Sequence, residues 1–269
     1  MPQSDIKNLL VVGIDTVSIA NSAKKAGYKI YAADYFGDID LRHACCGFKA
    51  IIKQKCGKSC GRIESKFKPE AFLKMAKFIT EKYKVDGILL SSGLDDDFNV
   101  LHKLNDLAPI LGNSPRIIES VRKRSSFFKE LKRLGIAYPE TAYVKNIEEA
   151  KEAAAKIGYP VVVKPLRGFG GAKIRTARNS KEIERAIAEI SSVSGEVLVQ
   201  KFIHGLHASI FLLTTSKDVK VLTINEQLFG LHFFFQEEPF KYCGNIVPLH
   251  VANSIFKKCE HIAEKIALH

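Results

Sequence analysis

The sequence predicts an α/β protein, with a small doubly wound sheet in the first half and an α+β arrangement in the second. Helix-like and strand-like segments alternate from residue 8 to about residue 118, which is typical of βαβ units around a parallel sheet. Two later strand-like segments, Ala208 to Thr214 and Val219 to Asn225, flank a Lys217-Asp218 turn, which favours antiparallel pairing. The 269 residues can bury one large core or two to three small ones.

The first βαβ unit covers residues 8 to 34. Asn8 to Gly13 is an apolar run typical of a buried strand. Thr16 to Ala26 is predicted as a helix that Gly27 ends, and Tyr28 to Asp34 as the next strand. The first strand is followed by Ile-Asp-Thr-Val-Ser, which lacks the two further glycines of a dinucleotide-binding loop. This spacing argues against an oxidoreductase.

Helix and strand signals continue past this unit and change character near residue 118. Pro69 to Tyr83 is predicted as a helix and Gly87 to Ser92 as a strand. Pro115 to Ser120 marks a predicted domain boundary, followed by one helix from about Ser120 to Leu134 that Gly135 ends. The later predictions are helix Ile147 to Ile157, strand Val161 to Val163, helix Ser180 to Ser191, strand Val197 to Ile203 and a helix from Asn253 onward. We predict domains at residues 1–118, 119–194 and 195–269.

Composition indicates an ordinary globular protein with 46% hydrophobic residues. No window of about 18 uncharged apolar residues exists, and Met1 to Lys7 is polar, so we expect neither a membrane span nor a signal peptide, and a cytoplasmic location. The net charge of +12 suits a polyanion, but its lysines are distributed along helical segments, as on solvated helix faces. Nucleic-acid binding is therefore not expected as the main function.

Four of the six cysteines cluster, at Cys45, Cys46, Cys56 and Cys60, beside His43. The spacing of the last two is compatible with zinc or an iron–sulfur cluster, although the paired two-residue spacings of a zinc ribbon are absent. A metal site and a disulfide between nearby members both stay open. The remaining two, Cys243 and Cys259, are predicted to be packing residues.

The clearest chemical signal is a lysine at the end of an apolar strand, followed by glycines. Val161 to Val163 lead into Lys164, which places a charge at the edge of an apolar layer. Gly168, Gly170 and Gly171 then allow backbone N–H groups to approach an anion closely. Phosphate is the predicted ligand, and a solvated hairpin turn is the alternative. The spacing differs from that of the common phosphate-binding loop, in which the lysine follows the last glycine.

The order of these elements resembles the ATP-grasp superfamily over essentially the whole chain. The motifs that carry the resemblance are Leu134-Gly-Ile-Ala-Tyr-Pro139, Val163-Lys164-Pro165 with its glycine loop, and Val197-Leu-Val-Gln-Lys-Phe-Ile-His-Gly205. The chain looks most similar to the archaeal ATP-dependent carboligase-like group related to biotin carboxylase and carbamoyl-phosphate synthetase. The fold implied is a small doubly wound domain followed by an ATP-grasp fold that is truncated at its C-terminal end.

The resemblance implies a nucleotide site between two subdomains. Lys164 would contact the α-phosphate and the adenine edge, and the loop from Arg167 to Lys173 would cover the β- and γ-phosphates. The second phosphate-binding cation falls on Arg124, or on Lys123 if the register slips by one, and Arg can replace Lys there. The implied cofactor-binding residues are Arg124, Lys164, Arg167, Gly168, Gly170, Gly171, Lys173, the adenine hinge Gln200, Lys201, Phe202 and Ile203, and His207.

Three departures from the family pattern concern this site. Lys201 stands where the hinge usually has a glutamate, and His207 where the ribose-binding acid is expected. The family's Mg²⁺ ligands lie on late strands that include a Glu-x-Asn-Pro motif, and the final segment has no Glu-x-Asn. Glu226 is the one early acid expected near the site. Robust Mg²⁺-dependent ligation by this chain would require Glu226, Glu237 and Glu238 to be reconsidered as metal ligands. We therefore expect a fragment or an inactive remnant that binds nucleotide but turns ATP over poorly.

The implied parent activity is ATP-dependent carboxylate–amine or carboxylate–thiol ligation through an acylphosphate, with ATP and Mg²⁺ as cofactors and a small carboxylate as substrate. The alternatives are a nucleotide-binding module without turnover and, third, a basic nucleic-acid-binding protein. The segment Phe233 to Pro248 suits either a substrate-side loop, with Gly244 and Asn245 as substrate contacts, or an edge strand. No catalytic residue is assigned, and a homodimer is left open.

Overall fold

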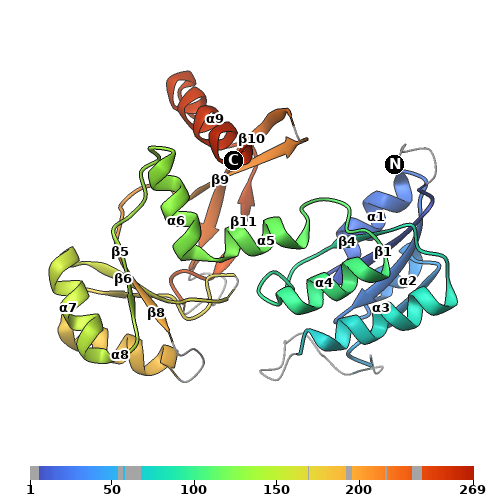
Figure 1. Ribbon diagram of the computed structural model, residues 1–269, viewed down its shortest axis with the longest axis horizontal. Helices are drawn as coiled ribbons and strands as arrows, with labels where there is room; N and C mark the ends of the chain where they lie inside the picture. The colour runs from blue at the N-terminus through green and yellow to red at the C-terminus, as the bar shows by residue number, and fades with distance from the viewer. Residues whose placement is uncertain are drawn as a thin grey trace. The chain divides into compact units, whose positions relative to one another are not determined.

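The computed structural model describes residues 6–53, 57, 68–168, 170–191, 196–215, 217–231 and 238–269. The chain divides into two compact units, Met1–Lys123 and Arg124–His269 (Figure 1). Each unit has its own sheets and its own buried core. Among the described residues, no helix has the length and apolar composition needed to span a membrane.

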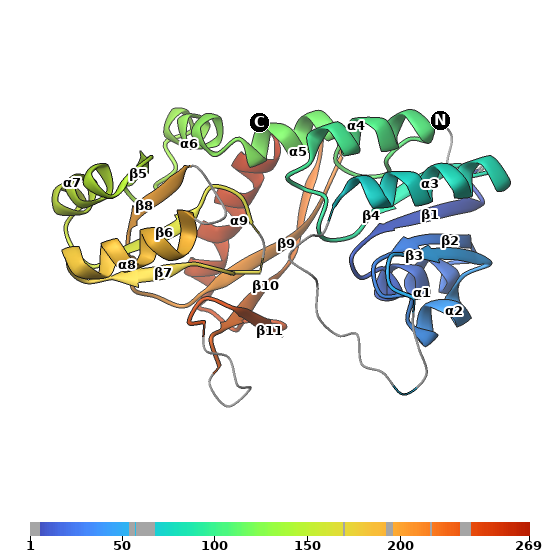
Figure 2. The ribbon, with the colours of Figure 1, turned by 90° about the horizontal axis from the view of Figure 1, so that it is seen from below.

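The first unit is the predicted doubly wound sheet, with four parallel strands in the order β3-β2-β1-β4. The strands are β1 (Asn8–Gly13), β2 (Lys29–Asp34), β3 (Gly47–Ala50) and β4 (Gly87–Leu90). The helices are α1 (Val17–Lys25), α2 (Ile39–Ala44), α3 (Glu70–Lys82), α4 (Phe98–Leu107) and α5 (Pro115–Arg122). Successive side chains of β1 point to opposite faces, so Leu9 packs with α1 and α2 while Leu10 packs with α3 and α4. Figure 2 shows α1 and α2 on one side of this sheet and α3 and α4 on the other.

The loops at the carboxyl ends of these strands are joined by the buried carboxylate of Asp34. Its Oδ2 accepts from the N–H of Thr16 at 3.0 Å and from the hydroxyl of Thr16 at 2.9 Å. Its Oδ1 accepts from the N–H groups of Phe36 at 2.8 Å and Gly37 at 2.7 Å. Both oxygens of this buried carboxylate thus have hydrogen-bond donors. Asp34 therefore ties the loop after β1 to the loop after β2.

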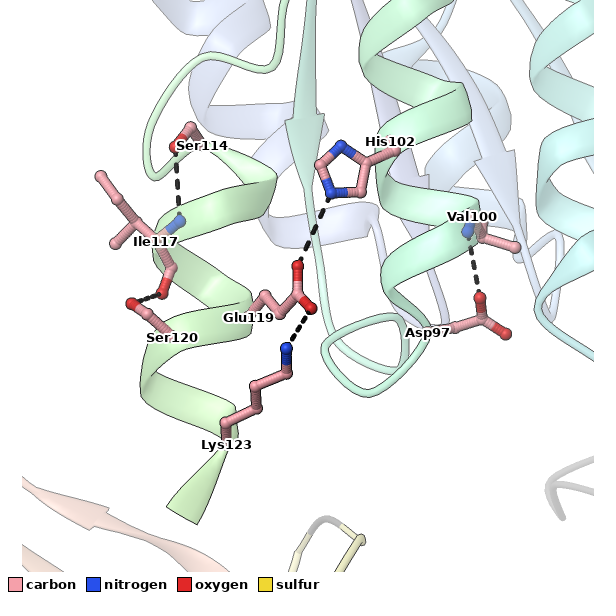
Figure 3. Close-up of polar contacts among 8 residues, drawn as sticks. All are labelled: Asp97, Val100, His102, Ser114, Ile117, Glu119, Ser120 and Lys123. Atoms are coloured by element: carbon pink, nitrogen blue, oxygen red, sulfur yellow. Dashed lines mark hydrogen bonds and ion pairs between the residues drawn. The ribbon is translucent and has the colours of Figure 1, made fainter. Parts of the chain in front are cut away.

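The single helix predicted from Ser120 to Leu134 is wrong, because the structure has two helices that meet at Lys123. Helix α5 starts at Pro115, where the Ser114 hydroxyl accepts from the N–H of Ile117 at 3.4 Å, and α6 covers Arg124–Arg133 (Figure 3). Lys123 has a ψ of 81°, which ends α5. The segment Pro115 to Ser120, predicted as a domain boundary, is therefore part of α5, with Ser114 as its N-cap and Pro115 as its first residue. The predicted boundary between residues 118 and 119 thus lies inside α5.

The second unit begins with an antiparallel sheet in the order β5-β8-β6-β7. Its strands are β5 (Thr141–Val144), β6 (Val161–Pro165), β7 (Arg175–Ala177) and β8 (Val197–Lys201). Helices α7 (Ile147–Ile157) and α8 (Ser180–Ser191) pack on one face of this sheet through a shared apolar core (Figure 1). The lysine strand predicted from Val161 is thus the third strand of the sheet.

A second antiparallel sheet has the order β11-β10-β9, with β9 (Ala208–Thr214), β10 (Val219–Phe229) and β11 (Tyr242–Ile246). The predicted pairing of the first two strands is confirmed. Strand β11 pairs with β10, so this part of the segment from Phe233 to Pro248 is an edge strand, whereas residues 233–237 lie outside the described residues. Helix α9 (Asn253–Ala267) packs on β9 and β10, and Lys265 Nζ donates to the Leu134 carbonyl at 2.8 Å, just past the end of α6.

Candidate functional site

The polar residues of the candidate site share one face of the β5-β8-β6-β7 sheet. Thr141 lies directly opposite Gln200, and Lys164 lies diagonally from Gln200 because it is opposite Leu198. Opposed and diagonal residues of antiparallel strands project to the same side. The alternate residues Val161, Val163, Val197 and Val199 are buried in the core shared with α7 and α8. The polar face is therefore the one that these helices leave uncovered.

Lys164 is half-buried, and its ammonium donates to Gln200 Oε1 at 2.6 Å. Burial, and then the positive charge of Arg124, lower the pKa of Lys164 from 10.5 to about 8. Both causes disfavour the charged form. An anion placed next to Lys164 would reverse this effect, so the environment of the lysine favours the binding of an anionic ligand.

Arg124, the first residue of α6, is the second cation of this cluster. Its Nε donates to the Leu166 carbonyl at 3.3 Å, immediately after the lysine strand. Burial raises the pKa of the neighbouring Tyr143, and the Arg124 charge opposes that rise. The sequence left Lys123 as the alternative, but Lys123 Nζ pairs with Glu119 at 2.7 Å in the first unit (Figure 3). The structure thus brings Arg124, rather than Lys123, together with Lys164.

The glycine loop is packed against the segment Glu238–Tyr242. Gly170 and Gly171 have φ values of +63° and +76°, and the Gly170 carbonyl accepts from the Tyr242 N–H at 3.0 Å. A Cβ added to Gly171 would lie 1.6 Å from the Phe240 carbonyl oxygen, so only glycine fits. Of the other members of the loop, Arg167 and Gly168 are exposed, and Lys173 is half-buried with a φ of +60°.

The hinge residues have different roles. The N–H of Lys201 donates to the Glu140 carbonyl at 2.8 Å and that of Phe202 to the Pro160 carbonyl at 3.2 Å. Ile203 is 61% exposed, and its N–H has no acceptor among the described residues. The Lys201 side chain is on the helix-covered face, where Nζ donates to the Gly158 carbonyl at 2.8 Å and caps α7. Of these three N–H groups, Ile203 therefore offers the one that is open to a ligand.

The remaining predicted residues lie on the second sheet. The exposed His207 makes an edge-to-face contact with Phe229, with the two ring centroids 5.0 Å apart. The His207 carbonyl accepts from the Gln227 N–H at 2.8 Å. Gly244 and Asn245 are in β11, opposite Leu228 and Gln227 of β10. The structure does not place these residues in the cluster around Lys164.

Thr141 and Tyr143 are members of the polar face that the sequence did not single out. The alternation Thr-Ala-Tyr-Val from residue 141 to residue 144 is a short strand signal that could have indicated both. Its length of only four residues made the signal weak.

A family described as ATP-grasp domain matches residues 122–269, which are more than half of the chain. The chain belongs to the ATP-grasp family. The carbamoyl phosphate synthase large chain of Archaeoglobus fulgidus is 32% identical over 154 residues, which are 56% of this chain and 14% of that protein. This ATP-grasp chain therefore spans a small part of the length of that curated relative.

Solved structures show the same fold at low identity. Biotin carboxylase from Campylobacter jejuni, in a β,γ-ATP complex, has a TM-score of 0.76 and 20% identity, covering 98% of this chain and 59% of that chain. A second structure is the biotin carboxylase domain of Hydrogenobacter thermophilus 2-oxoglutarate carboxylase, in complex with MgADP, ADP and bicarbonate. It has a TM-score of 0.75 and 19% identity, and the match covers 97% of this chain and 58% of that chain. The ATP-grasp fold expected from the motifs is confirmed.

The predicted Mg²⁺ ligand of this ATP-grasp chain, Glu226, is not part of a larger group of metal-binding side chains in the described residues. Glu226 is in β10, paired with Ala208 and Ile246, and no group of three or more His, Cys, Asp or Glu residues in the described parts could hold a metal. Glu238 lies 3.4 Å from Arg175, and Glu237 is outside the described residues. Mg²⁺ is commonly held by one or two carboxylates together with water and substrate phosphates, so Glu226 stays a predicted ligand.

The cysteine cluster is described only in part. Cys45 is half-buried, and burial raises the pKa of its thiol to about 12. In the metal-free protein this thiol is therefore protonated at neutral pH. Cys46 is exposed, whereas Cys56 and Cys60 lie outside the described residues, so the metal and disulfide alternatives stay predictions.

Proposed function

We propose that this chain binds ATP on the polar face of the β5-β8-β6-β7 sheet and serves an ATP-dependent ligase. The observation that carries the proposal is the convergence of Lys164 and Arg124 beside the glycine loop. The Arg124 charge lowers the pKa of Lys164, so the two cations lie near each other in a half-buried place. Phosphate groups would offset the mutual repulsion of these cations and accept charge-assisted hydrogen bonds from both.

The adenine base is assigned to the hinge. The open N–H of Ile203 can donate to a ring nitrogen of the purine, and its carbonyl can accept from an amino group. Backbone groups suit this task because their positions are fixed by the strand that precedes them. Lys201 contributes through the backbone alone, since its side chain caps α7.

The proposed reaction is the activation of a small carboxylate by ATP. The carboxylate oxygen attacks the γ-phosphorus, ADP leaves, and an amine or thiol then displaces phosphate from the acylphosphate. Lys164 and Arg124 would hold the phosphates and stabilise their charge, and the glycine loop would cover them. Mg²⁺ is expected because a similar solved structure contains MgADP, and it would supply further positive charge at the phosphates when bound, with Glu226 as a candidate ligand.

Calorimetric titration of ATP tests the nucleotide site. We expect Lys164→Ala to weaken ATP binding by about 1.5–3 kcal/mol, the range for hydrogen bonds to charged groups. Lys156→Ala is the matched control, because Lys156 is an exposed lysine on α7, on the opposite side of the sheet. Unchanged ATP affinity in a folded Lys164→Ala protein would contradict the assignment.

A second measurement separates a ligase from a nucleotide-binding module without turnover. Phosphate release from ATP is followed with and without candidate acids, beginning with bicarbonate. Release that requires an added acid supports the ligase, whereas tight ATP binding without acid-dependent release supports the module. Binding of RNA with a steep salt dependence would instead favour a nucleic-acid-binding protein.

A further inference from the structure

We infer that Thr141 is a positioning residue for Lys164 and that it acts through Gln200. The inference rests on the proposed nucleotide site and adds a residue to it. Three hydrogen bonds connect the four groups involved. Thr141 Oγ1 bonds to the Pro139 carbonyl at 2.7 Å, Gln200 Nε2 to Thr141 Oγ1 at 2.6 Å, and Lys164 Nζ to Gln200 Oε1 at 2.6 Å.

The hydrogen bond from Thr141 to the Pro139 carbonyl decides which group donates and which accepts in the other two hydrogen bonds. A backbone carbonyl can only accept, so the Thr141 hydroxyl donates its one proton to Pro139. The Thr141 oxygen must then accept from Gln200 Nε2, because its own proton is already used. The carboxamide oxygen of Gln200 is thereby turned toward Lys164, where it accepts from the ammonium.

The opposite orientation of the Gln200 amide is unfavourable at both ends. Its NH₂ group would face the ammonium of Lys164, which places donor against donor. Its oxygen would require the proton of Thr141, which would leave the Pro139 carbonyl without that donor. Gln200 is only 8% exposed, so water has little access to compensate for either loss.

Strand pairing places the three side chains next to one another. Thr141 and Gln200 are a directly opposed pair of β5 and β8, and Lys164 is the diagonal neighbour on β6. Because Arg124 repels the ammonium, the acceptor on Gln200 is the described contact that favours the charged lysine. A lysine that keeps its proton and its direction is what a phosphate ligand requires.

The test compares Thr141→Val, which removes the hydroxyl at similar volume, with Thr141→Ser, which keeps it. Lys164 is titrated in the ligand-free protein by NMR of ¹³Cε-labelled lysine, with Lys164→Ala used to assign its signal. We expect Thr141→Val to lower the pKa of Lys164 and to weaken ATP binding about 3- to 10-fold, the size of one hydrogen bond. We expect Thr141→Ser to restore both to the native values.

A second variant decides whether Thr141 acts through the amide. Gln200→Glu places an acceptor oxygen toward Lys164 in either orientation, so Thr141→Val should have little effect on the lysine pKa in that background. An unchanged Lys164 titration in Thr141→Val, or an equal shift in the Gln200→Glu background, would overturn the inference. Thr141→Ala replaces Thr141→Val if the latter does not fold. Because the titration needs no nucleotide, failure of ATP binding in the native protein would count against the proposed function alone.

Discussion

Lys164 and Arg124 place two positive charges on one half-buried sheet face, and the chemistry of the site follows from that arrangement. Each cation has a protein acceptor, Gln200 Oε1 for Lys164 and the Leu166 carbonyl for Arg124. Both acceptors are neutral, so they orient the cations without cancelling their charge. The proximity of the two cations therefore favours an anionic ligand, which would offset their mutual repulsion.

The pH dependence of ATP binding tests the protonation of Lys164. Its pKa in the free protein is about 8, and bound phosphate should raise it, because an opposite charge favours the ammonium. Binding ATP then requires a proton above pH 8, so affinity should be constant below pH 7 and fall about tenfold per pH unit above 8. Calorimetric titration of ATP at several pH values between about 6.5 and 9.5 measures this dependence. Lys164→Arg, which stays charged, should lose this dependence, and a flat native profile would contradict the assignment.

At the scale of elements, the glycine loop and the segment Glu238–Tyr242 form one packed unit. The Gly170 carbonyl accepts from the Tyr242 N–H, and Gly230 N–H donates to the Lys241 carbonyl at 2.9 Å. Arg175, which follows the loop, reaches Glu238 at 3.4 Å. The loop that is proposed to cover phosphate is therefore held by the connection between β10 and β11.

Gly171→Ala should separate the loop from this connection. The new Cβ would overlap the Phe240 carbonyl, and φ at this position is +76°, so we expect a cost on the order of 1–3 kcal/mol to the packed loop. Faster exchange of the Tyr242 amide and weaker ATP binding are the expected results, measured by hydrogen exchange and calorimetry. Gly205→Ala is the control, since its Cβ would meet nothing within 4 Å. Native exchange at Tyr242 in Gly171→Ala would show that the packed loop does not depend on this contact.

At the scale of the whole molecule, each unit is stabilised by its own buried residues. The first unit buries apolar side chains on both faces of its parallel sheet, and Asp34 joins the loops at one end. The second unit buries one face of its first sheet under α7 and α8 and leaves the other face for polar residues. This difference explains why the candidate cation cluster is found in the second unit.

Asp34→Asn tests whether the first unit supports the nucleotide site. The amide would present an NH₂ group to N–H and hydroxyl donors, so the first unit should lose about 2–4 kcal/mol of stability, a range for a buried network left without its charged acceptor. Hydrogen exchange in β1 and β2 should accelerate. ATP affinity at a temperature where the protein stays folded should be native. A clear loss of affinity would show that the first unit contributes to nucleotide binding.

Local patterns in the sequence determined the first βαβ unit, the hairpin of β9 and β10, and the position of Lys164 before its glycines. These features depend on periodicity over a few residues and on the backbone freedom of glycine, which neighbouring residues largely decide. The family resemblance also follows from motifs in order along the chain, and the family match confirms it.

Tertiary structure alone decided which side chains meet. The Gln200 amide contacts Thr141 across 59 residues and Lys164 across 36, and Lys201 turns to α7 because it is on the other face of the same strand. The break at Lys123 likewise depends on its neighbours, since the preceding Arg122 is held by Asp96 at 2.8 Å. Strand register and side-chain direction are set by contacts between distant segments, and no local pattern contains them.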